Sequence, residues 1–274
     1  NESFEDFGVI VSEDGDHRKD EVRFGLRTIK NFGDQISADV VAERKSGGPF
    51  KNLEDFLVRM KHSGLNKKSL EALALSGALD SIEKRSLVLG NIDVLLQFIK
   101  EERSVNSDQA SLFANQDTGS HLNLRDRTGE TIKIKTGMNE ELTYTLPMSR
   151  KDELFWEKEL LGLYVSGHPL EKYRKLLSGP GKNIASVKER GYTTNTTLAG
   201  VVDEVKVITT KKGTRMAFVR ISDFTDSMEV VVFPDMFKEH GDTLAGDQVL
   251  AISGKLSKKD DQLNLIADKI KTLA

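Results

Sequence analysis

One stretch decides the fold of the C-terminal part of this chain: Arg215-Met216-Ala217-Phe218-Val219-Arg220-Ile221. Every second residue from Ala217 to Ile221 is apolar and small or branched, and the positions between them carry a phenylalanine and an arginine. Successive side chains of a β-strand point to opposite faces, so this alternation predicts a strand with one buried face. If that face is the core, Phe218 and Arg220 lie on the opposite face as an aromatic ring beside a cation.

The same two-residue period recurs on both sides of this strand. Four further strands are predicted at Thr197–Ile208, Met228–Pro234, Val249–Leu256 and Leu263–Ile270. A short helix, Asp235–His240, lies between the third and fourth strands. Five strands with a helix in that place are typical of the OB-fold, a small closed barrel. We therefore predict an OB-fold domain over residues 195–274.

OB-fold barrels bind single-stranded nucleic acid on strands 2 and 3 and on the loops that join strands 1–2 and 4–5. Both predicted loops carry a lysine pair. The candidate single-strand-binding residues are Lys211, Lys212, Arg215, Phe218, Arg220, Lys258 and Lys259. The alternative is that Phe218 belongs to the core and the lysines are merely solvated. Residues 195–274 have a net charge of −1, so we expect single-strand binding to be weak.

Upstream, the apolar residues change to a helical period. Leu26, Ile29 and Phe32 are spaced for a short helix, and Asp34 is a candidate N-cap for a second helix that follows it. The turn between them contains Asn31 and a glycine, which both tolerate positive φ. Two short helices joined by such a turn predict a helix-hairpin-helix.

The chemistry of that motif is specific. Backbone N–H groups in the first turn of the second helix have no partner within the helix, and they can donate to a DNA phosphate at the positive end of the helix dipole. Such a contact does not depend on base sequence. The candidate duplex-binding residues here are Lys30, Asn31, Gly33 and Asp34. The alternative is an ordinary helical hairpin that only packs on its neighbours.

More helices complete an all-α unit over residues 25–108. Gly48 and the proline after it end the second helix, and Asn52 is a candidate cap for the next. A further helix begins at Asn66, and a last one is expected over 87–99. Lys67 and Lys68 lie in a first helical turn, where cations oppose the helix dipole. They are therefore further candidates for a duplex phosphate, although a solvated helix face also explains them.

The predicted fold is thus α+β and multidomain: a small all-α helix-hairpin-helix domain followed by a five-stranded OB-fold barrel. The 274 residues suffice for two such domains. The net charge of −3 is uneven, at +3 for residues 21–90 and +4 for 161–194. These two segments are the ones to test for a polyanion partner.

Composition excludes several classes of site. There is no cysteine and hence no disulfide or thiolate metal site, and five scattered histidines show no ligand spacing. No apolar run approaches the 18 residues of a membrane span, so we expect no membrane partner and a cytoplasmic protein. The chain begins at Asn1 in the middle of a pattern, and we expect it to be part of a longer protein. No arrangement of Ser, Cys or carboxylate residues around His168 supports nucleophilic catalysis, so we expect this histidine to be structural. Trp156 is expected in the core.

A polar segment separates the two domains, over about residues 100–150. It carries one predicted hairpin, Thr131–Lys135 with Leu142–Leu146, and otherwise linker. The apolar pair Leu112-Phe113 is isolated in it. Such a pair contributes little to a core, so either a partner's pocket buries it or it folds back onto the adjacent helix.

Several stretches resemble one protein family, the α subunits of bacterial replicative DNA polymerase III. They are Val22-Arg23-Phe24-Gly25-Leu26, Ile29-Lys30-Asn31, Gly48-Pro49-Phe50, Ser76-Gly77-Ala78-Leu79-Asp80, Glu157-Lys158-Glu159-Leu160-Leu161-Gly162 and Ser166-Gly167-His168-Pro169-Leu170. The resemblance covers nearly the whole chain and implies a C-terminal portion of such a subunit, without the catalytic palm. The usual helix-hairpin-helix motif has glycine at both turn positions, whereas Asn31 holds the first position here.

The resemblance implies an order of parts. They are the end of the fingers domain (1–24), a helix-hairpin-helix and clamp-binding domain (25–108), a clamp-binding peptide (109–113), a variable loop or hairpin (114–148), connecting helices (149–194) and the OB domain (195–274). In the family, a pentapeptide of the form Gln-x-(Ser/Asp)-Leu-Phe binds the sliding clamp. It corresponds here to Gln109, Ser111, Leu112 and Phe113.

The implied partners are duplex and single-stranded DNA, the sliding clamp and other replisome subunits. The parent protein would be a DNA-directed DNA polymerase, a nucleotidyltransferase whose carboxylates hold Mg²⁺ in the palm. No strand-borne Asp-x-Asp set occurs here, so no catalytic residue, metal or cofactor is expected in this part. Two alternatives are a stand-alone single-strand-binding or repair adaptor and an OB appendage of an aminoacyl-tRNA synthetase. The latter leaves the hairpin and the pentapeptide unexplained.

Overall fold

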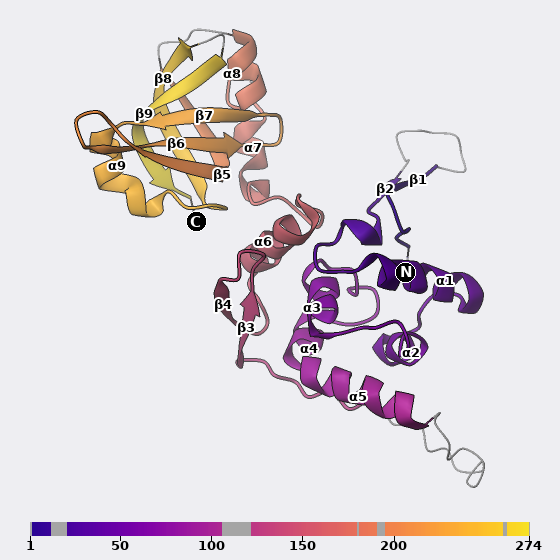
Figure 1. Cartoon of the computed structure of the whole chain (residues 1–274). Coiled ribbons are helices and arrows are strands. Elements are labelled where there is room, and N and C mark those ends of the chain that lie inside the picture. Colours follow the sequence, from indigo (N-terminus) through magenta and orange to yellow (C-terminus); the bar gives the residue numbers. More distant parts are fainter. Residues whose placement is uncertain are drawn as a thin grey trace. The chain divides into compact units, whose positions relative to one another are not determined.

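The computed structural model describes residues 2–11, 21–105, 122–179, 181–190, 195–259 and 262–273. The chain divides into two compact units, Asn1–Ser166 and Gly167–Ala274 (Figure 1), and each is considered by itself. The first is the helical unit and the second the barrel unit. The pentapeptide Gln109–Phe113 lies outside the described residues.

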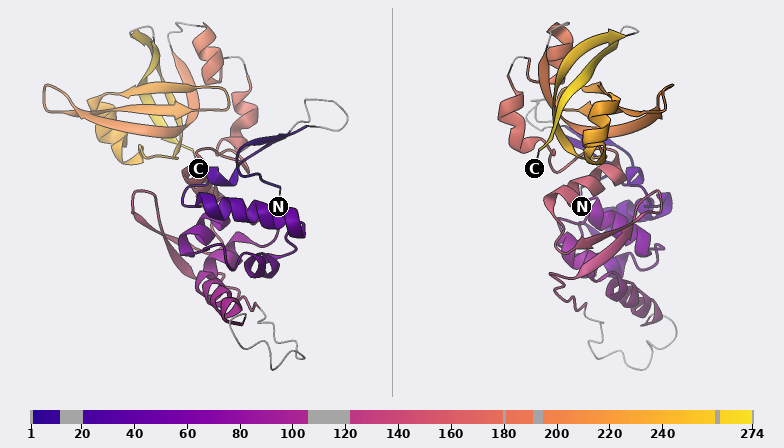
Figure 2. Two further views of the ribbon diagram at one scale, coloured as in Figure 1. Left: turned by 45° about the vertical axis from the view of Figure 1, so that its right-hand side comes forward. Right: turned by 90° about the vertical axis from the view of Figure 1, so that its left-hand side faces the viewer.

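The barrel unit is a closed five-stranded barrel. Its strands are β5 (Thr196–Thr209), β6 (Arg215–Ser222), β7 (Ser227–Val232), β8 (Val249–Lys259) and β9 (Gln262–Thr272). They close in the order β5-β6-β7-β9-β8, and of the described strand pairs only β7–β9 is parallel. Figure 2 draws these strands in orange to yellow. Helix α9 (Pro234–His240) follows β7, and the 3₁₀ turn η4 (Gly241–Thr243) follows α9. This is the OB-fold, as predicted.

Alternation along β6 is as predicted from Ala217 to Ile221, whereas Met216, which strict alternation places on the outer face with Phe218, is buried. Ala217, Val219 and Ile221 are completely buried in the barrel core, whereas Phe218 is half-buried and Arg220 is exposed. A β-bulge interrupts the neighbouring strand β5, whose pairing with β6 shifts between Val202 and Glu204. A bulge adds one residue to one strand and changes which residues face outward after it. The outward residues of β5 are therefore set by this bulge.

The predicted connecting segment 149–194 contributes to both cores. Helix α6 (Arg150–Leu161) belongs to the helical unit. The barrel unit begins with the 3₁₀ turn η3 (Glu171–Tyr173), α7 (Arg174–Leu177) and α8 (Ile184–Arg190). Ile184 and Val187 of α8 are buried in the barrel core. The buried carboxylate of Asp223, just after β6, accepts a hydrogen bond from the Ile184 N–H at 2.7 Å and so anchors α8 to the barrel.

His168 lies at the start of the barrel unit. Its Nδ1 accepts a hydrogen bond from the Leu170 N–H at 3.1 Å, and its ring packs on Phe224 at 4.5 Å between centroids. The guanidinium of Arg174 lies 4.0 Å from the centre of the same phenylalanine ring. These contacts agree with the predicted structural role of His168.

The helical unit packs its helices on one apolar core. They are η2 (Leu26–Thr28), α1 (Asp34–Gly47), α2 (Leu53–Arg59), α3 (Lys67–Leu75), α4 (Arg85–Gly90), α5 (Ile92–Val105) and α6. Strands β1 (Gly8–Ile10) and β2 (Glu21–Arg23) pair antiparallel. Asn52 caps α2 by accepting the Asp55 N–H, and Gly48 ends α1 with a φ of 77°. Both local signals were read from the sequence.

The single helix expected over 87–99 is wrong, because the chain breaks at Asn91 between α4 and α5. The Asn91 amide is buried and donates to the Leu87 carbonyl at 2.8 Å and to the Arg125 carbonyl at 2.9 Å. A Cβ on the preceding Gly90 would lie 3.0 Å from the Leu146 side chain. The segment that contains Arg125 and Leu146 therefore packs closely against the chain at this break.

That later segment forms part of the helical core. Strands β3 (Thr131–Lys135) and β4 (Glu141–Thr145) pair as the predicted hairpin. Ile134, Leu146 and Trp156 are all buried in the helical core. Trp156 is 2% exposed, which confirms its expected place.

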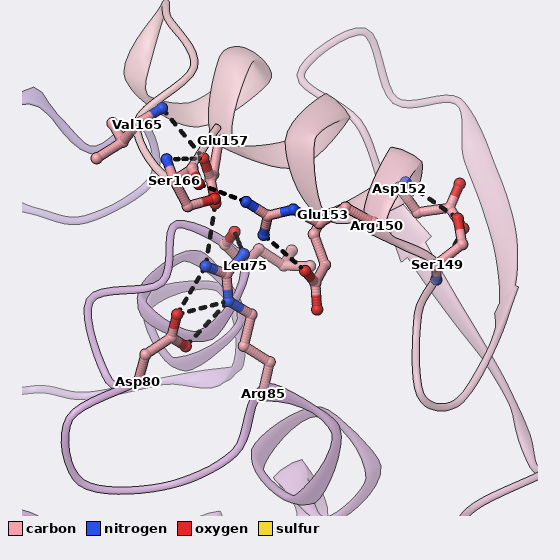
Figure 3. A network of polar contacts seen from close by, with 10 residues as sticks. All are labelled: Leu75, Asp80, Arg85, Ser149, Arg150, Asp152, Glu153, Glu157, Val165 and Ser166. Atoms are coloured by element: carbon pink, nitrogen blue, oxygen red, sulfur yellow. Dashed lines mark hydrogen bonds and ion pairs between the residues drawn. The ribbon is translucent and has the colours of Figure 1, made fainter. Parts of the chain in front are cut away.

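One buried carboxylate joins distant parts of the helical unit. Glu157 on α6 is 1% exposed and accepts hydrogen bonds from the backbone N–H groups of Val165 and Ser166 and from the Ser166 hydroxyl (Figure 3). The Arg85 guanidinium donates to Glu157 at 3.0 Å and also pairs with Asp80 at 2.7 Å. Burial alone would raise the pKa of the Glu157 carboxyl, but hydrogen bonds from Ser166, Arg85 and Val165 outweigh burial and lower it.

We expect Glu157→Gln to destabilise the helical unit by about 3 kcal/mol, because it removes one charge of a buried ion pair and the charged acceptor that several buried donors share. Every hydrogen-bond partner of the carboxylate is a donor, so the NH₂ group of a glutamine there would face donors and find no acceptor among them. Trp156 is the only tryptophan, so its fluorescence during urea unfolding reports on this unit. The control is Glu130→Gln, which removes an exposed pair with Arg127 and should cost about 0–1 kcal/mol.

The same variant gives a pH test. The folded pKa of Glu157 is lowered, so its stabilisation is fully present above the ordinary glutamate pKa of about 4.3 and is lost as the pH falls through the folded pKa. The stability difference between the unmodified chain and Glu157→Gln should therefore shrink on acidification from about pH 6 to below about pH 4. A difference that stays constant or grows on acidification would contradict the assignment.

Candidate nucleic-acid interfaces

The first candidate site is the turn before α1. Its first helix is shorter than predicted, because only Leu26–Thr28 form a single 3₁₀ turn. The Lys30 N–H donates to the Leu160 carbonyl of α6 at 3.0 Å, so it is not available to continue a helix. The turn itself is as expected at Asn31, which has a φ of 66°.

Gly33, rather than Asp34, is the N-cap of α1. Gly33 is extended, at φ −65° and ψ 151°, and its carbonyl accepts the Ser37 N–H. No side chain caps this helix end, so first-turn N–H groups face away from the helix without a side-chain acceptor. A Cβ built on Gly33 would meet nothing within 4 Å. The surface in front of this helix end is therefore open to a ligand.

Charges near the turn are mixed. The Lys30 ammonium lies 3.9 Å from the Glu159 carboxylate, and Asp34 places a negative charge in the first turn of α1. Lys67 and Lys68 open α3, where Lys67 lies 3.9 Å from Glu71. Within the described residues, no ion pair or hydrogen bond joins these two lysines to the turn. Part of the role of Lys67 is therefore to pair with a glutamate one turn later in the same helix.

The second candidate site is a groove of about 1270 Å³ on the outer face of the barrel. It is open, with polar and apolar walls. Its lining residues are Lys188, Glu204, Lys206, Ile208, Phe218, Arg220, Asp226, Ser227, Met228, Glu229, Lys258, Gln262, Leu263 and Asn264. They come from α8 and from all five strands or the turns beside them, so only the folded barrel assembles this groove.

Three of the predicted single-strand-binding residues line this groove: Phe218, Arg220 and Lys258. Three others do not. Lys211 and Lys212 are exposed in the β5–β6 turn. The Arg215 guanidinium lies 5.2 Å from the centre of the Phe237 ring of α9. The side chain of Lys259 lies outside what the structure describes.

Sequence reasoning missed two cations of the groove, Lys206 and Lys188. Lys206 is paired directly with Phe218 across β5 and β6. The alternation of Glu204, Lys206 and Ile208 past the bulge was the available signal for Lys206. Lys188 had none, because α8 approaches β7 only in the folded barrel.

Within the groove, cations and carboxylates alternate. Lys188 forms an ion pair with Asp226 at 2.7 Å, and this hydrogen bond lowers the pKa of the Asp226 carboxyl. Glu229 accepts a hydrogen bond from the Asn264 amide at 3.2 Å. The side chains of Arg220 and Lys206 form no ion pair or hydrogen bond within the described parts of the chain. These two cations are the ones available to a ligand.

Comparison with known proteins agrees with this architecture. A family described as "Helix-hairpin-helix motif" matches residues 1–87, and one described as "OB-fold nucleic acid binding domain" matches residues 196–273. DNA polymerase III subunit alpha of Bacillus subtilis is 34% identical over 92% of this chain. The subunits of Borreliella burgdorferi and Aquifex aeolicus are 30% and 32% identical over 98% and 92% of it.

The chain belongs to the DNA polymerase III α-subunit family. It covers only 21%, 22% and 18% of the length of these three relatives, so it corresponds to about a fifth of such a subunit. Both parts of this polymerase III segment belong to domain types that suggest nucleic-acid binding. In the described part of the chain, no helix is long and apolar enough to cross a membrane. No group of three or more acidic or histidine side chains there is placed to hold a metal ion.

Proposed function

We propose that this segment is a non-catalytic DNA-binding and clamp-binding portion of a bacterial replicative polymerase. The observation that carries the proposal is the groove, where the Phe218 ring lies beside Lys206 and Arg220, two cations that form no ion pair with any described residue. In the proposed arrangement, the helical unit holds duplex DNA and the barrel unit holds the single-stranded template. The parent subunit would supply the polymerase chemistry and Mg²⁺ from its palm.

The groove supports single-strand binding because its aromatic ring can stack on a base while its cations contact the phosphates. Phe218 is half-buried on β6 and offers a ring face for stacking, which is worth about 1–3 kcal/mol per base. Lys206 lies opposite it on β5, and Arg220 is two residues along the same face. Stacking and phosphate contacts of this kind tolerate any base sequence, as a polymerase template requires.

The turn before α1 supports duplex binding through the backbone. The end of α1 lacks a side-chain cap, and the open position at Gly33 lets a phosphate approach the N–H groups. Lys30 adds a cation beside it. Lys67 and Lys68 are proposed as further phosphate contacts, with Glu71 as the competing partner of Lys67.

Clamp binding is proposed for Gln109, Ser111, Leu112 and Phe113. Burial of each of the two apolar side chains in a partner pocket is worth roughly 1.5–3 kcal/mol, and the glutamine amide can satisfy the rim of that pocket. The cost of ordering the peptide leaves a moderate affinity. A moderate affinity is sufficient for a tether, because DNA held by the same chain raises the effective concentration of the peptide near a clamp on that DNA.

The remaining assignments are proposals of the same kind. We assign residues 1–24 to the end of the fingers, 25–108 to the clamp-binding domain, 149–194 to connecting helices and 195–274 to the OB domain. Other replisome subunits are proposed partners. A cytoplasmic location at the nucleoid follows from the proposed work on chromosomal DNA.

The groove is tested by Arg220→Ala and Lys206→Ala. Each should weaken binding of a fluorescent oligo(dT) at low salt, and each should reduce the slope of log affinity against log salt by about 0.7. Phe218→Ala should cost about 1–3 kcal/mol of binding with little change in that slope. Lys238→Ala, which removes an exposed lysine of α9 outside the groove and outside the predicted contacts, is the matched control. Equal losses from Lys238→Ala and Lys206→Ala would contradict the groove as the site.

The duplex site is tested by Gly33→Val. The new side chain has room in the free protein but stands where a phosphate must approach, so duplex binding should fall for every base sequence alike. Competition among several duplexes of different sequence measures this. Gly246→Val is the control, because a Cβ there also meets nothing within 4 Å. A sequence-dependent loss would contradict capture of phosphate by the backbone.

The clamp site is tested by replacing Leu112 and Phe113 together with Ala. This change should abolish co-elution of the chain with a bacterial sliding clamp, while oligo(dT) binding by the barrel stays intact. Retention of the complex by the double variant would refute the pentapeptide assignment.

A further inference from the structure

Arg220 lies between two carboxylates on the floor of the groove. Strand register places Glu204 of β5 directly opposite Arg220 on one side and Glu229 of β7 directly opposite on the other. Directly paired residues of antiparallel strands have their Cβ atoms about 4.5–5.5 Å apart on the same face. All three residues line the groove, with Glu204 exposed and Glu229 half-buried.

This arrangement differs from a structural ion pair. Within the described residues, the Arg220 guanidinium forms no ion pair with either carboxylate. Lys188 and Asp226, at the edge of the same groove, do form a close pair at 2.7 Å. The two glutamates therefore leave the donors of Arg220 exposed, while their own charges stay near any anion that binds it.

A phosphate that binds Arg220 consequently meets two negative charges. Like charges a few ångströms apart at a protein surface repel each other even when water screens them. The surplus of cations over carboxylates in the groove is small, with Lys188, Lys206, Arg220 and Lys258 against Glu204, Asp226 and Glu229. A site selected only for tight binding of a polyanion would not carry acids on both sides of its central arginine.

We propose that Glu204 and Glu229 lower the affinity of the groove for single-stranded DNA, so that a bound strand dissociates readily and another can replace it. This inference rests on the proposed single-strand binding at the groove. The two glutamates act on the sugar–phosphate backbone and so act on every base sequence alike. Their removal strengthens binding, in contrast to the removal of Arg220 or Lys206.

A competing role for Glu229 is base recognition. A carboxylate can accept a hydrogen bond from the exocyclic amine of cytosine, whereas thymine has no such amine. Two observations favour the repulsive role. Glu229 already accepts a hydrogen bond from Asn264, and a second carboxylate stands symmetrically on the other side of Arg220.

The experiment compares Glu204→Gln, Glu229→Gln and the double variant in the whole 274-residue chain. Fluorescence anisotropy measures binding of oligo(dT) and oligo(dC) of about 16 nucleotides at low salt. We expect each single change to tighten binding roughly threefold and the double change roughly tenfold, for both oligonucleotides. Glu239→Gln on α9 removes the same charge outside the groove and should leave binding nearly unchanged.

Three results would overturn the inference while leaving single-strand binding in place. They are unchanged affinity in all groove variants, equal tightening by Glu239→Gln, and loss of oligo(dC) binding alone in Glu229→Gln. Each single variant tests the inference independently. If thermal melting shows that one of them is misfolded, the binding result of the other decides. If neither the unmodified chain nor any variant binds either oligonucleotide, the proposed function of the groove fails and the inference fails with it.

Discussion

Closing five strands into a barrel imposes one constraint on the second half of this chain: each strand must bury one face and expose the other. On β6 this constraint places Ala217, Val219 and Ile221 in the core and leaves Phe218 and Arg220 outside. Closure also removes the free strand edges, so the outer face of the sheet remains the natural place for a ligand. The groove, its stacking ring and its charges all follow from that alternation and from the bulge in β5 that shifts it.

The helical unit depends on a different interaction, the buried carboxylate of Glu157. It satisfies two backbone N–H groups at 165 and 166 and one arginine from the start of α4. The segment that ends the helical unit is thereby tied to the helices that precede it. Glu157 and Ser166, which lie in two of the stretches that resemble the family, are joined directly by these hydrogen bonds.

Each proposed DNA-binding site combines cations with nearby acids, so we expect each contact to be weak by itself. The turn before α1 has an acid in its helix's first turn and an acid beside its lysine, and the groove balances its cations with carboxylates. Weak sites on one chain act together, because binding at one raises the effective concentration at the next. In the proposed function the template strand must move past these contacts, which favours contacts that release easily. The balance of charges at both sites is consistent with that requirement.

Local chemistry alone determined much of this protein. The two-residue period predicted the strands, the Asn52 and Gly48 signals placed helix ends, and Phe218 and Arg220 were assigned to the outer face from spacing. Tertiary structure decided the rest through contacts between residues far apart in the sequence. Leu160 takes the N–H that would have continued the first helix, Arg125 holds the break at Asn91, and α8 brings Lys188 to the groove. Such partners cannot be read from a local pattern, because only the packed core determines which distant groups meet.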